Sequence, residues 1–546
     1  MMCRIVLFAC LLLSATYLPA QQRAGKSQSD KPKLVVGIVV DQMRYDYLVR
    51  FSGKYSNDGF RRLLRDGFSF SNARYDYVPT NTAPGHACIY TGTGPAYNGI
   101  INNDWYDRKL GKSIYCVNDT TEKPVGTTSI SGKMSPRNLL SSTVTDELRL
   151  ASNNRSKVIG IALKDRGAIL PAGQTGNAAY WHDPYTNNWV SSTYYLKELP
   201  KWAIAFNDRR VSDSLLTGKW NTLLPISEYT ESAADNNPYE GLYDGESKPV
   251  FPRNLDELKK ENSELIRSTP MGNTFTLEFA KAAIAGEHLG KGTETDFLAV
   301  SFSSTDYVGH MFGIHSIELE DTYLRLDRDL ADLLSFLDKW LASDYLIFLT
   351  SDHGAAHNPG YASTLGYNAE FYTPANLSDS LKQYLKSLYQ AESLVGSVSA
   401  HNVYLDREAV EASGLDIVEV QERCASFLKK LDGVSIVMTA NELEKGLKRS
   451  GFYAYLQNGF NADRSSDVSV LLKPGWISWY RKTGTNHGSP YSYDNHVPLI
   501  FSGKGIRPGS SDEGVHVADI APTISSLLDI EFPSACTGRT LITYLK

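Results

Sequence analysis

Cysteine is scarce in this chain, and charge of either sign is not concentrated. The 546 residues include six cysteines, and no two have the Cys-X-X-Cys spacing typical of a structural zinc site. A chain of this length with so few, scattered cysteines does not depend on a disulfide framework, although one bridge between unidentified partners fits the spacing. The formal net charge is −6, and no basic run is long enough to follow a nucleic-acid backbone. Nucleic-acid binding as the main task is therefore disfavoured.

The apolar run at the start of the chain is too short to cross a membrane. In "MMCRIVLFACLLLSATYLPA", Arg4 precedes an apolar stretch that ends at Leu13, and small residues follow. This pattern is typical of a secretory signal peptide over residues 1–20, with cleavage near Ala20. Lipid anchoring would need Cys10, but "LFAC" fits such a site poorly. We therefore expect an exported protein, periplasmic or secreted if its source is a bacterium, that has no membrane span.

Short apolar runs without alternation recur along the rest of the chain. Such runs suit strands that are buried on both faces, as in a parallel sheet covered by helices. They lie at residues 34–40, 157–163, 297–302, 345–350 and 497–501. Helices are predicted between and after them, over residues 135–148, 269–286, 317–340 and 517–530, the first with Ser135 as N-cap and Pro136 in the first turn. The alternation predicts an α/β fold in which helices flank a largely parallel sheet.

Two long intervals interrupt this alternation. Residues 173–268 are polar and aromatic, with many Asn, Tyr and Pro residues, and residues 362–482 mix a charged helical stretch with short strands. We expect both to be insertions at the loop ends of one sheet. Residues 33–546 would then form a single catalytic domain that carries two large insertions.

Three aspartates stand at or just beyond the ends of predicted strands. Asp41 follows the run at 34–40, Asp306 follows the run at 297–302 after three small residues, and Asp352 follows the run at 345–350. In open α/β sheets, ligands gather outside the carboxyl ends of the strands. Three carboxylates at one place would repel one another unless a cation sat among them. Each aspartate taken alone could equally be a helix cap or a turn residue.

Histidines beside these aspartates make the predicted cation more specific. His310 lies four residues after Asp306, His353 adjoins Asp352, and His487 lies in the late motif "GTNHGSPYSYDNH". Mixed aspartate and histidine ligation favours zinc, whereas calcium and magnesium prefer oxygen alone. The six ligands divide into two sets of three. Isolated histidines such as His182 are more typical of packing or surface positions.

Seven ordered motifs resemble the alkaline phosphatase superfamily from about Lys33 to the C-terminus. The sequence is most similar to the secreted, phosphate-irrepressible bacterial alkaline phosphatases with a threonine nucleophile. The motifs that carry the resemblance are "VVDQMRYDYL", "YVPTNTAPGHACIYTG", "GIINNDWYD", "ALKDRGAILPAG", "SSTDYVGHMFG", "SDHGAAH" and "GTNHGSPYSYDNHVPLIF". The fold that the resemblance implies is a three-layer α/β/α sandwich.

The resemblance also implies a zinc-dependent phosphate monoester hydrolase with two Zn²⁺ ions, no third Mg²⁺ site and a monomeric state. Thr82, rather than Thr80, occupies the nucleophile position, where "APGHACIYTG" indicates the start of a helix. The phosphoryl-binding residues would be Asn103, Lys164 and Arg166. One zinc would be held by Asp41, Asp352, His353 and Thr82, and the other by Asp306, His310 and His487.

Three alternatives differ in what they require of the site. Nucleotide pyrophosphatase/phosphodiesterases share the threonine, the asparagine and all six ligands, so only "KDR" at 164–166 argues for monoesters. Sulfatases need an oxidisable Cys or Ser at the nucleophile, which Thr82 does not supply. An exported binding protein that had lost catalysis would have no need of an intact nucleophile and complete ligand sets. We therefore expect small phosphate monoesters as substrates.

Overall fold

The computed structural model describes residues 31–374, 376–446 and 450–546, so the predicted signal peptide lies outside the described residues. Its centre is a ten-stranded sheet of order β20-β2-β19-β12-β1-β11-β6-β7-β8-β5. The strands are β1 (Leu34–Val40), β2 (Phe68–Arg74), β5 (Pro124–Val125), β6 (Val158–Ala162), β7 (Ala178–Asp183), β8 (Asn188–Ser192), β11 (Asp296–Phe302), β12 (Tyr345–Thr350), β19 (His496–Gly503) and β20 (Gly509–His516). The five strands from β12 to β7 are mutually parallel. Antiparallel pairs occur only towards the two edges, at β19 and β8.

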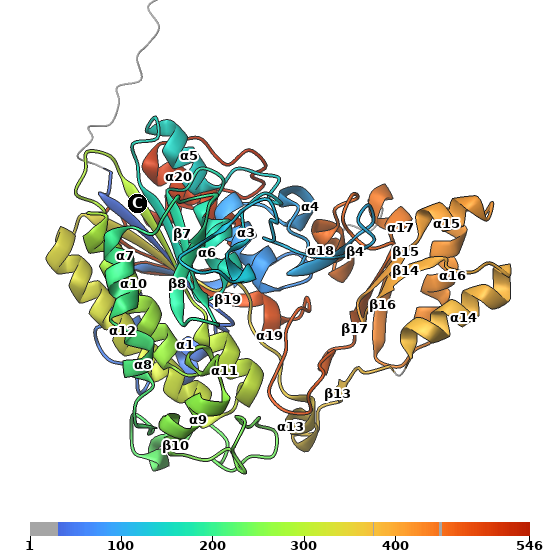
Figure 1. Cartoon of the computed structure of the whole chain (residues 1–546), viewed down its shortest axis with the longest axis horizontal. Helices are drawn as coiled ribbons and strands as arrows, with labels where there is room; N and C mark the ends of the chain where they lie inside the picture. Colours follow the sequence, from blue (N-terminus) through green and yellow to red (C-terminus); the bar gives the residue numbers. More distant parts are fainter. Residues whose placement is uncertain (1–30, 375, 447–449) are drawn as a thin grey trace, which may run out of the picture.

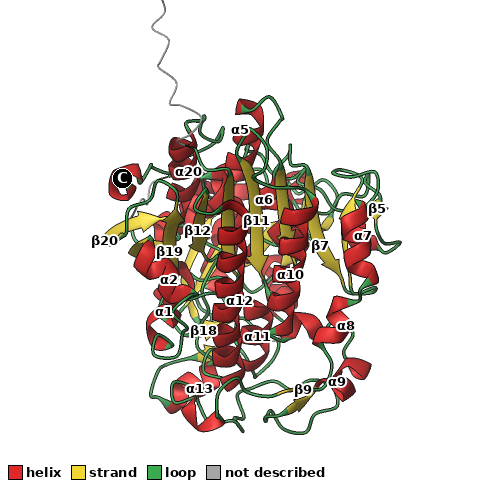
Figure 2. Ribbon diagram, turned by 90° about the vertical axis from the view of Figure 1, so that its left-hand side faces the viewer, coloured by secondary structure: helices red, strands yellow, loops and turns green. Residues whose placement is uncertain are grey.

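Helices cover both faces of the sheet, as the continuous apolar strands predict. Figure 2 shows α10 (Met271–Gly286) and α12 (Ile317–Leu341) side by side across one face. The opposite layer includes α3 (Thr82–Thr91), α6 (Asp165–Ala172) and α20 (Ile520–Leu528). Alternate residues of β1 pack into the two layers: Leu34, Val36, Ile38 and Val40 into the first, Val35 and Val39 into the second.

One predicted helix begins later than the sequence indicated. The helix expected over 135–148 is α5, which spans Val144–Ala151, and residues 135–143 form turns and loop. Thr143 and Asp146 form a reciprocal capping box that fixes the start of α5. The Ser135 hydroxyl does not cap a helix; it donates to Asp119 Oδ2 at 2.7 Å. A second, stronger N-terminal signal eight residues downstream therefore decides where the helix starts.

The two intervals expected to be insertions differ in structure. Residues 173–268, expected to be an insertion at the loop ends of the sheet, contain β7 and β8, which are strands of the central sheet itself. Residues 362–482 form a separate four-stranded sheet, set apart from the main body in Figure 1. Its strands are β14 (Val395–Val398), β15 (Asn402–Leu405), β17 (Val468–Leu472) and β16 (Val434–Thr439), and α14 (Leu377–Tyr389) and α16 (Ile417–Leu428) share its apolar core.

The described residues contain neither a disulfide nor a helix that could span a membrane. Cys88, Cys116, Cys424 and Cys536 are all free thiols, and none of them takes part in a disulfide. Of the helices in the described ranges, none is both long and apolar enough to cross a membrane.

His182 is a packing residue, and it makes stability depend on pH. The side chain is 1% exposed in β7, and burial, together with the Arg267 guanidinium, lowers the pKa of His182 to about 3. An unfolded histidine has a pKa of about 6.5, so below that pH the unfolded chain binds one more proton than the folded chain. Acidification from pH 7 to pH 5 should therefore lower the free energy of unfolding by about 2 kcal/mol through this residue.

The measurement compares the wild type with His182→Gln by urea denaturation at both pH values. The variant should lose about 2 kcal/mol less stability on acidification than the wild type. An equal loss in the two proteins would show that His182 does not cause the dependence.

Candidate active site

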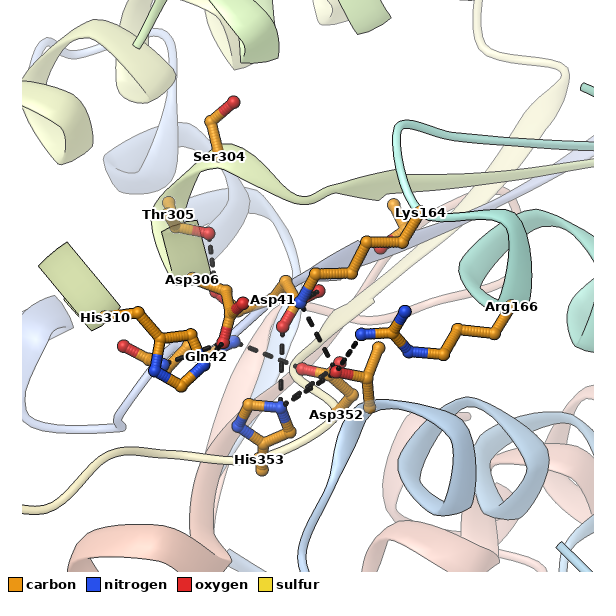
Figure 3. A network of polar contacts seen from close by, with 12 residues as sticks. Asp41, Gln42, Lys164, Arg166, Ser304, Thr305, Asp306, His310, Asp352 and His353 are labelled. Atoms are coloured by element: carbon orange, nitrogen blue, oxygen red, sulfur yellow. Dashed lines mark hydrogen bonds and ion pairs between the residues drawn. The ribbon is translucent and has the colours of Figure 1, made fainter. Parts of the chain in front are cut away.

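Charged side chains from four strand ends meet at one edge of the sheet. Asp41 follows β1, Lys164 lies two residues after β6, and Asp352 lies two residues after β12. After β11 the chain enters α11 (Ser304–Phe312), whose first turn carries Asp306. Figure 3 shows these side chains converging, and all four are buried. The expected gathering at the carboxyl ends of parallel strands is thus present in the fold.

The first set of possible metal ligands is Asp41, Asp352 and His353. One ligand atom from each lies within 4.8 Å of the others, and all three residues are fully buried. His353 donates from Nδ1 to the Gly354 carbonyl at 2.9 Å, which leaves Nε2 as an acceptor directed at the carboxylates. Oδ1 of Asp41 and Oδ2 of Asp352 are buried and accept no hydrogen bond, whereas Oδ2 of Asp41 forms an ion pair with Lys164. Buried oxygens of this kind fit a bound cation.

The second set is Asp306, His310 and His487. Asp306 Oδ1 lies 3.2 Å from His310 Nε2 and 3.6 Å from His487 Nε2. Each histidine donates its Nδ1–H to a carbonyl: His310 to Thr485 at 2.8 Å, and His487 to Thr80 at 2.9 Å. Both Nε2 atoms are therefore free to bind a metal, and the fit is as good as in the first set.

Burial and neighbouring charges tune these groups. Burial lowers the pKa of His353 and the pKa of His487, which favours the neutral form that binds a metal. Burial and the Asp352 carboxylate raise the pKa of Asp41. Lys164 Nζ lies 2.7 Å from Asp41 Oδ2 and 2.5 Å from Asp306 Oδ2. One ammonium among three aspartates leaves an excess of negative charge, which two cations would neutralise.

Thr82 lies between the first ligand set and two positive side chains. It is the first residue of α3 and 1% exposed. Its Oγ1 is 3.5 Å from His353 Nε2, 3.3 Å from Lys164 Nζ and 3.4 Å from Arg166 Nη2. Thr80 has a different position: its hydroxyl donates to the Ser489 carbonyl at 2.9 Å. The hydroxyl that the sequence indicated is therefore the one that faces the cluster.

The start of α3 is also where the predicted asparagine lies. Asn103 Oδ1 accepts from the Ala83 backbone N–H at 2.9 Å, so its amide sits at the helix N-terminus beside Thr82. All ten residues predicted from the sequence are thus brought into one site. The helix dipole at such a terminus favours an anion.

Two residues that the sequence analysis did not single out tie the site together. Gln42 donates from its backbone N–H to Asp352 Oδ1 at 3.1 Å and from Nε2 to Asp306 Oδ1 at 2.7 Å, so it links the two ligand sets. His86, one turn after Thr82, donates from Nδ1 to the Thr82 carbonyl at 2.9 Å. In the sequence, Gln42 follows Asp41 and His86 lies one helical turn after Thr82, and this proximity is the only local feature that indicated a role for them.

Tyr115 and Asp165 hold the Arg166 side chain. Tyr115, at the end of β4 (Lys112–Tyr115), donates its hydroxyl to Asp165, and Arg166 Nη1 donates to that hydroxyl at 3.0 Å. The Arg166 backbone N–H donates to Asp165 Oδ1 at 2.7 Å. The guanidinium is thereby aimed at Thr82 by groups from a separate hairpin. Tyr115 is a positioning residue in this arrangement.

Tyr115→Phe is expected to lower kcat/KM for a phosphate monoester by about tenfold, since it removes one hydrogen bond to a charged group. The loss should be smaller for a matched diester, because Arg166 faces the position of the extra charge. Steady-state kinetics on both substrates, with zinc content as the control, checks this. A variant that loses monoester and diester hydrolysis equally would contradict a role through Arg166.

Comparison with known proteins agrees with this geometry. A family model described as type I phosphodiesterase / nucleotide pyrophosphatase matches residues 35–495. The chain is 49% identical, over 94% of both chains, to a Myroides odoratus protein named calcium-transporting ATPase. It is 48% identical, over 94% of both chains, to alkaline phosphatase PafA of Elizabethkingia meningoseptica. It is 44% identical, over 100% of both chains, to alkaline phosphatase PhoV of Synechococcus elongatus.

The solved structure of PafA confirms the predicted fold class. It matches this chain with a TM-score of 0.91 at 47% sequence identity, covering 94% of this chain and 99% of that chain. Because the structural match covers nearly all of both chains, it includes the central sheet and the separate four-stranded sheet. The chain therefore belongs to the type I phosphodiesterase / nucleotide pyrophosphatase family, within the alkaline phosphatase superfamily.

Proposed function

We propose that this chain is a zinc-dependent phosphate monoester hydrolase that forms a covalent phosphothreonine at Thr82 and releases inorganic phosphate. The observation that carries the proposal is the position of one threonine hydroxyl at a helix start, within 3.5 Å of His353, Lys164 and Arg166. The similarity to PafA and PhoV, which are named alkaline phosphatases, supports monoesters as the substrate class.

Two zinc ions are the cofactors that the donor atoms fit best. Asp41, Asp352 and His353 would hold one ion, and Asp306, His310 and His487 the other. When bound, zinc lowers the pKa of a coordinated hydroxyl and neutralises negative charge on the phosphoryl oxygens. No third, magnesium site is proposed.

The chain's own residues carry out binding and attack. Asn103, Lys164 and Arg166 would bind the non-bridging phosphoryl oxygens, and the dipole of α3 would add to the attraction. Thr82 Oγ1 attacks phosphorus in line, so the Oγ1–phosphorus bond forms while the bond to the leaving-group oxygen breaks. Water then attacks the phosphothreonine, which breaks the Oγ1–phosphorus bond and restores the hydroxyl.

Lys164 and Arg166 favour monoesters over diesters. A monoester dianion carries one more negative charge than a diester, and both cations face the Thr82 hydroxyl at which the phosphoryl group would bind. Phosphodiester or nucleotide pyrophosphate hydrolysis is the alternative activity, because the family model carries that description. We place the enzyme outside the cytoplasm, with cleavage near Ala20, and expect a monomer.

The test measures p-nitrophenol release from p-nitrophenyl phosphate and from its methyl diester, together with zinc content. We expect about two zinc ions per chain, loss of turnover after chelation, recovery on adding zinc, and a higher kcat/KM for the monoester. Diester preference would transfer the assignment to the alternative activity. A protein that binds phosphate but releases none would be a non-catalytic binding protein.

A further inference from the structure

A large cleft opens beside the second ligand set, between the main body and the four-stranded sheet of residues 362–482. Its volume is about 610 Å³, and its lining includes His310, His487 and Asn103. In the proposed in-line reaction, the leaving group must point away from Thr82, on the side of His310 and His487. The cleft is therefore the space that a leaving group would enter, and this inference rests on the proposed function.

Contacts between the two parts fix the walls of the cleft. The ring of Tyr106, in β3 (Asp104–Asp107), lies 5.5 Å from the ring of Tyr404 in β15, measured between centroids. Arg108 Nη2 donates to Asp467 Oδ2 at 2.9 Å, and this ion pair joins the main body to the four-stranded sheet. The four-stranded sheet is thus held against the β3–β4 hairpin that follows Asn103.

The cleft lining is polar but almost uncharged. It includes seven serines, five asparagines and five Trp, Tyr or Phe residues, and in the described part of the chain no lysine or arginine lines it. Among the described lining residues, the only carboxylate is the exposed Asp104. His401, another lining residue, is exposed, and an exposed imidazole is mostly uncharged at pH 7. A second anionic group on a substrate would find hydroxyls and a carboxylate there, but no lysine or arginine in the part of the lining that the structure describes.

An aromatic ring stands at the inner end of the cleft. The Trp479 indole stacks on the His310 imidazole, with 5.0 Å between ring centroids and 18° between planes. Its Nε1–H donates to the Thr483 carbonyl at 3.0 Å, which fixes its orientation. The Tyr480 ring also contacts the indole, with 4.5 Å between centroids and 53° between planes. A ring on the leaving group would pack against this aromatic pair while its hydroxyls bond to the serines and asparagines.

We propose that the cleft selects phosphate monoesters whose leaving group is an uncharged, hydroxyl-bearing ring, and discriminates against monoesters that carry a second anionic group. Sugars and nucleosides share this chemistry.

6-Phosphogluconate and sorbitol 6-phosphate form the matched substrate pair, because both are open chains and differ only in a carboxylate or a hydroxymethyl group at the far end; glucose 6-phosphate supplies the ring. We expect kcat/KM to be at least about tenfold lower for 6-phosphogluconate than for sorbitol 6-phosphate, owing to the unpaired charge beside Asp104. Methyl phosphate serves as the reference because its leaving group does not reach into the cleft. If methyl phosphate and all other monoesters resist hydrolysis, the proposed function fails. If methyl phosphate reacts but the pair does not differ, only the present inference fails.

Two substitutions of one cleft residue test the cause of this selection. Ser397→Lys adds a cation on β14, and Ser397→Gln adds a neutral side chain of comparable length. With each value divided by that for methyl phosphate, Ser397→Lys should raise kcat/KM for 6-phosphogluconate relative to sorbitol 6-phosphate by about tenfold. Ser397→Gln should not. Equal ratios in both variants would overturn the charge argument.

The variant Trp479→Ala tests whether the ring that contacts the indole belongs to a sugar or to a nucleoside. Relative to methyl phosphate, and with zinc content measured, we expect kcat/KM to fall by about tenfold for the substrate whose ring stacks on the indole. A larger fall for AMP than for glucose 6-phosphate assigns nucleosides, and the reverse assigns sugars. The absence of a fall for either substrate would overturn the stacking contact.

Discussion

Thr82→Ala is expected to reduce kcat for phosphate monoesters by about 10⁴-fold or more, which is the scale seen when a covalent nucleophile is removed. The change deletes the hydroxyl that lies within 3.5 Å of His353, Lys164 and Arg166. The fold should persist, since Thr82 Oγ1 makes no contact with the apolar core and alanine is a good helix residue. Rapid-quench trapping of a phosphorylated peptide that contains residue 82 should succeed in the wild type and fail in the variant.

Thr80→Ala is the matched control, because it removes a neighbouring threonine hydroxyl whose bond goes to the Ser489 carbonyl. Its backbone carbonyl, which accepts from His487 Nδ1, is unaffected by the substitution. Thr80→Ala should therefore retain most of the turnover and all of the phosphopeptide. Comparable losses in the two variants, or a phosphopeptide that survives in Thr82→Ala, would mean that Thr82 is not the nucleophile.

Removing Lys164 and Arg166 together should depress monoester hydrolysis far more than diester hydrolysis. Each side chain is a charged donor near the reacting oxygen, and loss of one such donor typically costs about 10²- to 10³-fold in rate. The double alanine variant should thus lose about 10³-fold or more on a monoester, and at least about tenfold less on the matched diester. Steady-state kinetics with both p-nitrophenyl esters measures the ratio directly.

The single variant Arg166→Ala gives the cleaner comparison. Lys164 lies 2.7 Å from Asp41 Oδ2 and 2.5 Å from Asp306 Oδ2, so its removal could also change metal affinity. Arg166 contacts Thr82 and Tyr115 but none of the six possible metal ligands. Zinc content should be unchanged in Arg166→Ala while the preference for monoesters falls. Equal loss on both substrates would show that these cations do not recognise the extra charge.

Local sequence patterns were sufficient to predict most of the site. Asp41 and Asp352 each follow an apolar run that could be read as a buried strand, and His310 and His353 lie within four residues of a ligand partner. The rule that parallel strands present their carboxyl ends at one edge brings such residues together without any knowledge of loop paths. The choice of Thr82 over Thr80, by contrast, depended on the family resemblance.

Features decided by longer-range contacts were missed or misplaced. The order of strands places β7 and β8 in the central sheet, although residues 173–268 read as an insertion. Gln42 binds Asp306 across 264 positions, and Tyr115 reaches Asp165 from a separate hairpin. Glutamine and tyrosine are common surface and core residues, so the local sequence does not predict that Gln42 and Tyr115 position active-site groups.

By itself, the sequence determined the α/β class and indicated the candidate ligands and the threonine motif, because each depends on residue type and local position. The division of the ligands between two metal sites came from the family resemblance. Only the tertiary structure decided that Thr82 faces His353 across 271 positions, and that a cleft without lysine or arginine among its described lining residues opens beside His310. Such arrangements arise when distant segments pack against one another. Their free energy lies in contacts between segments, which no local pattern of residues records.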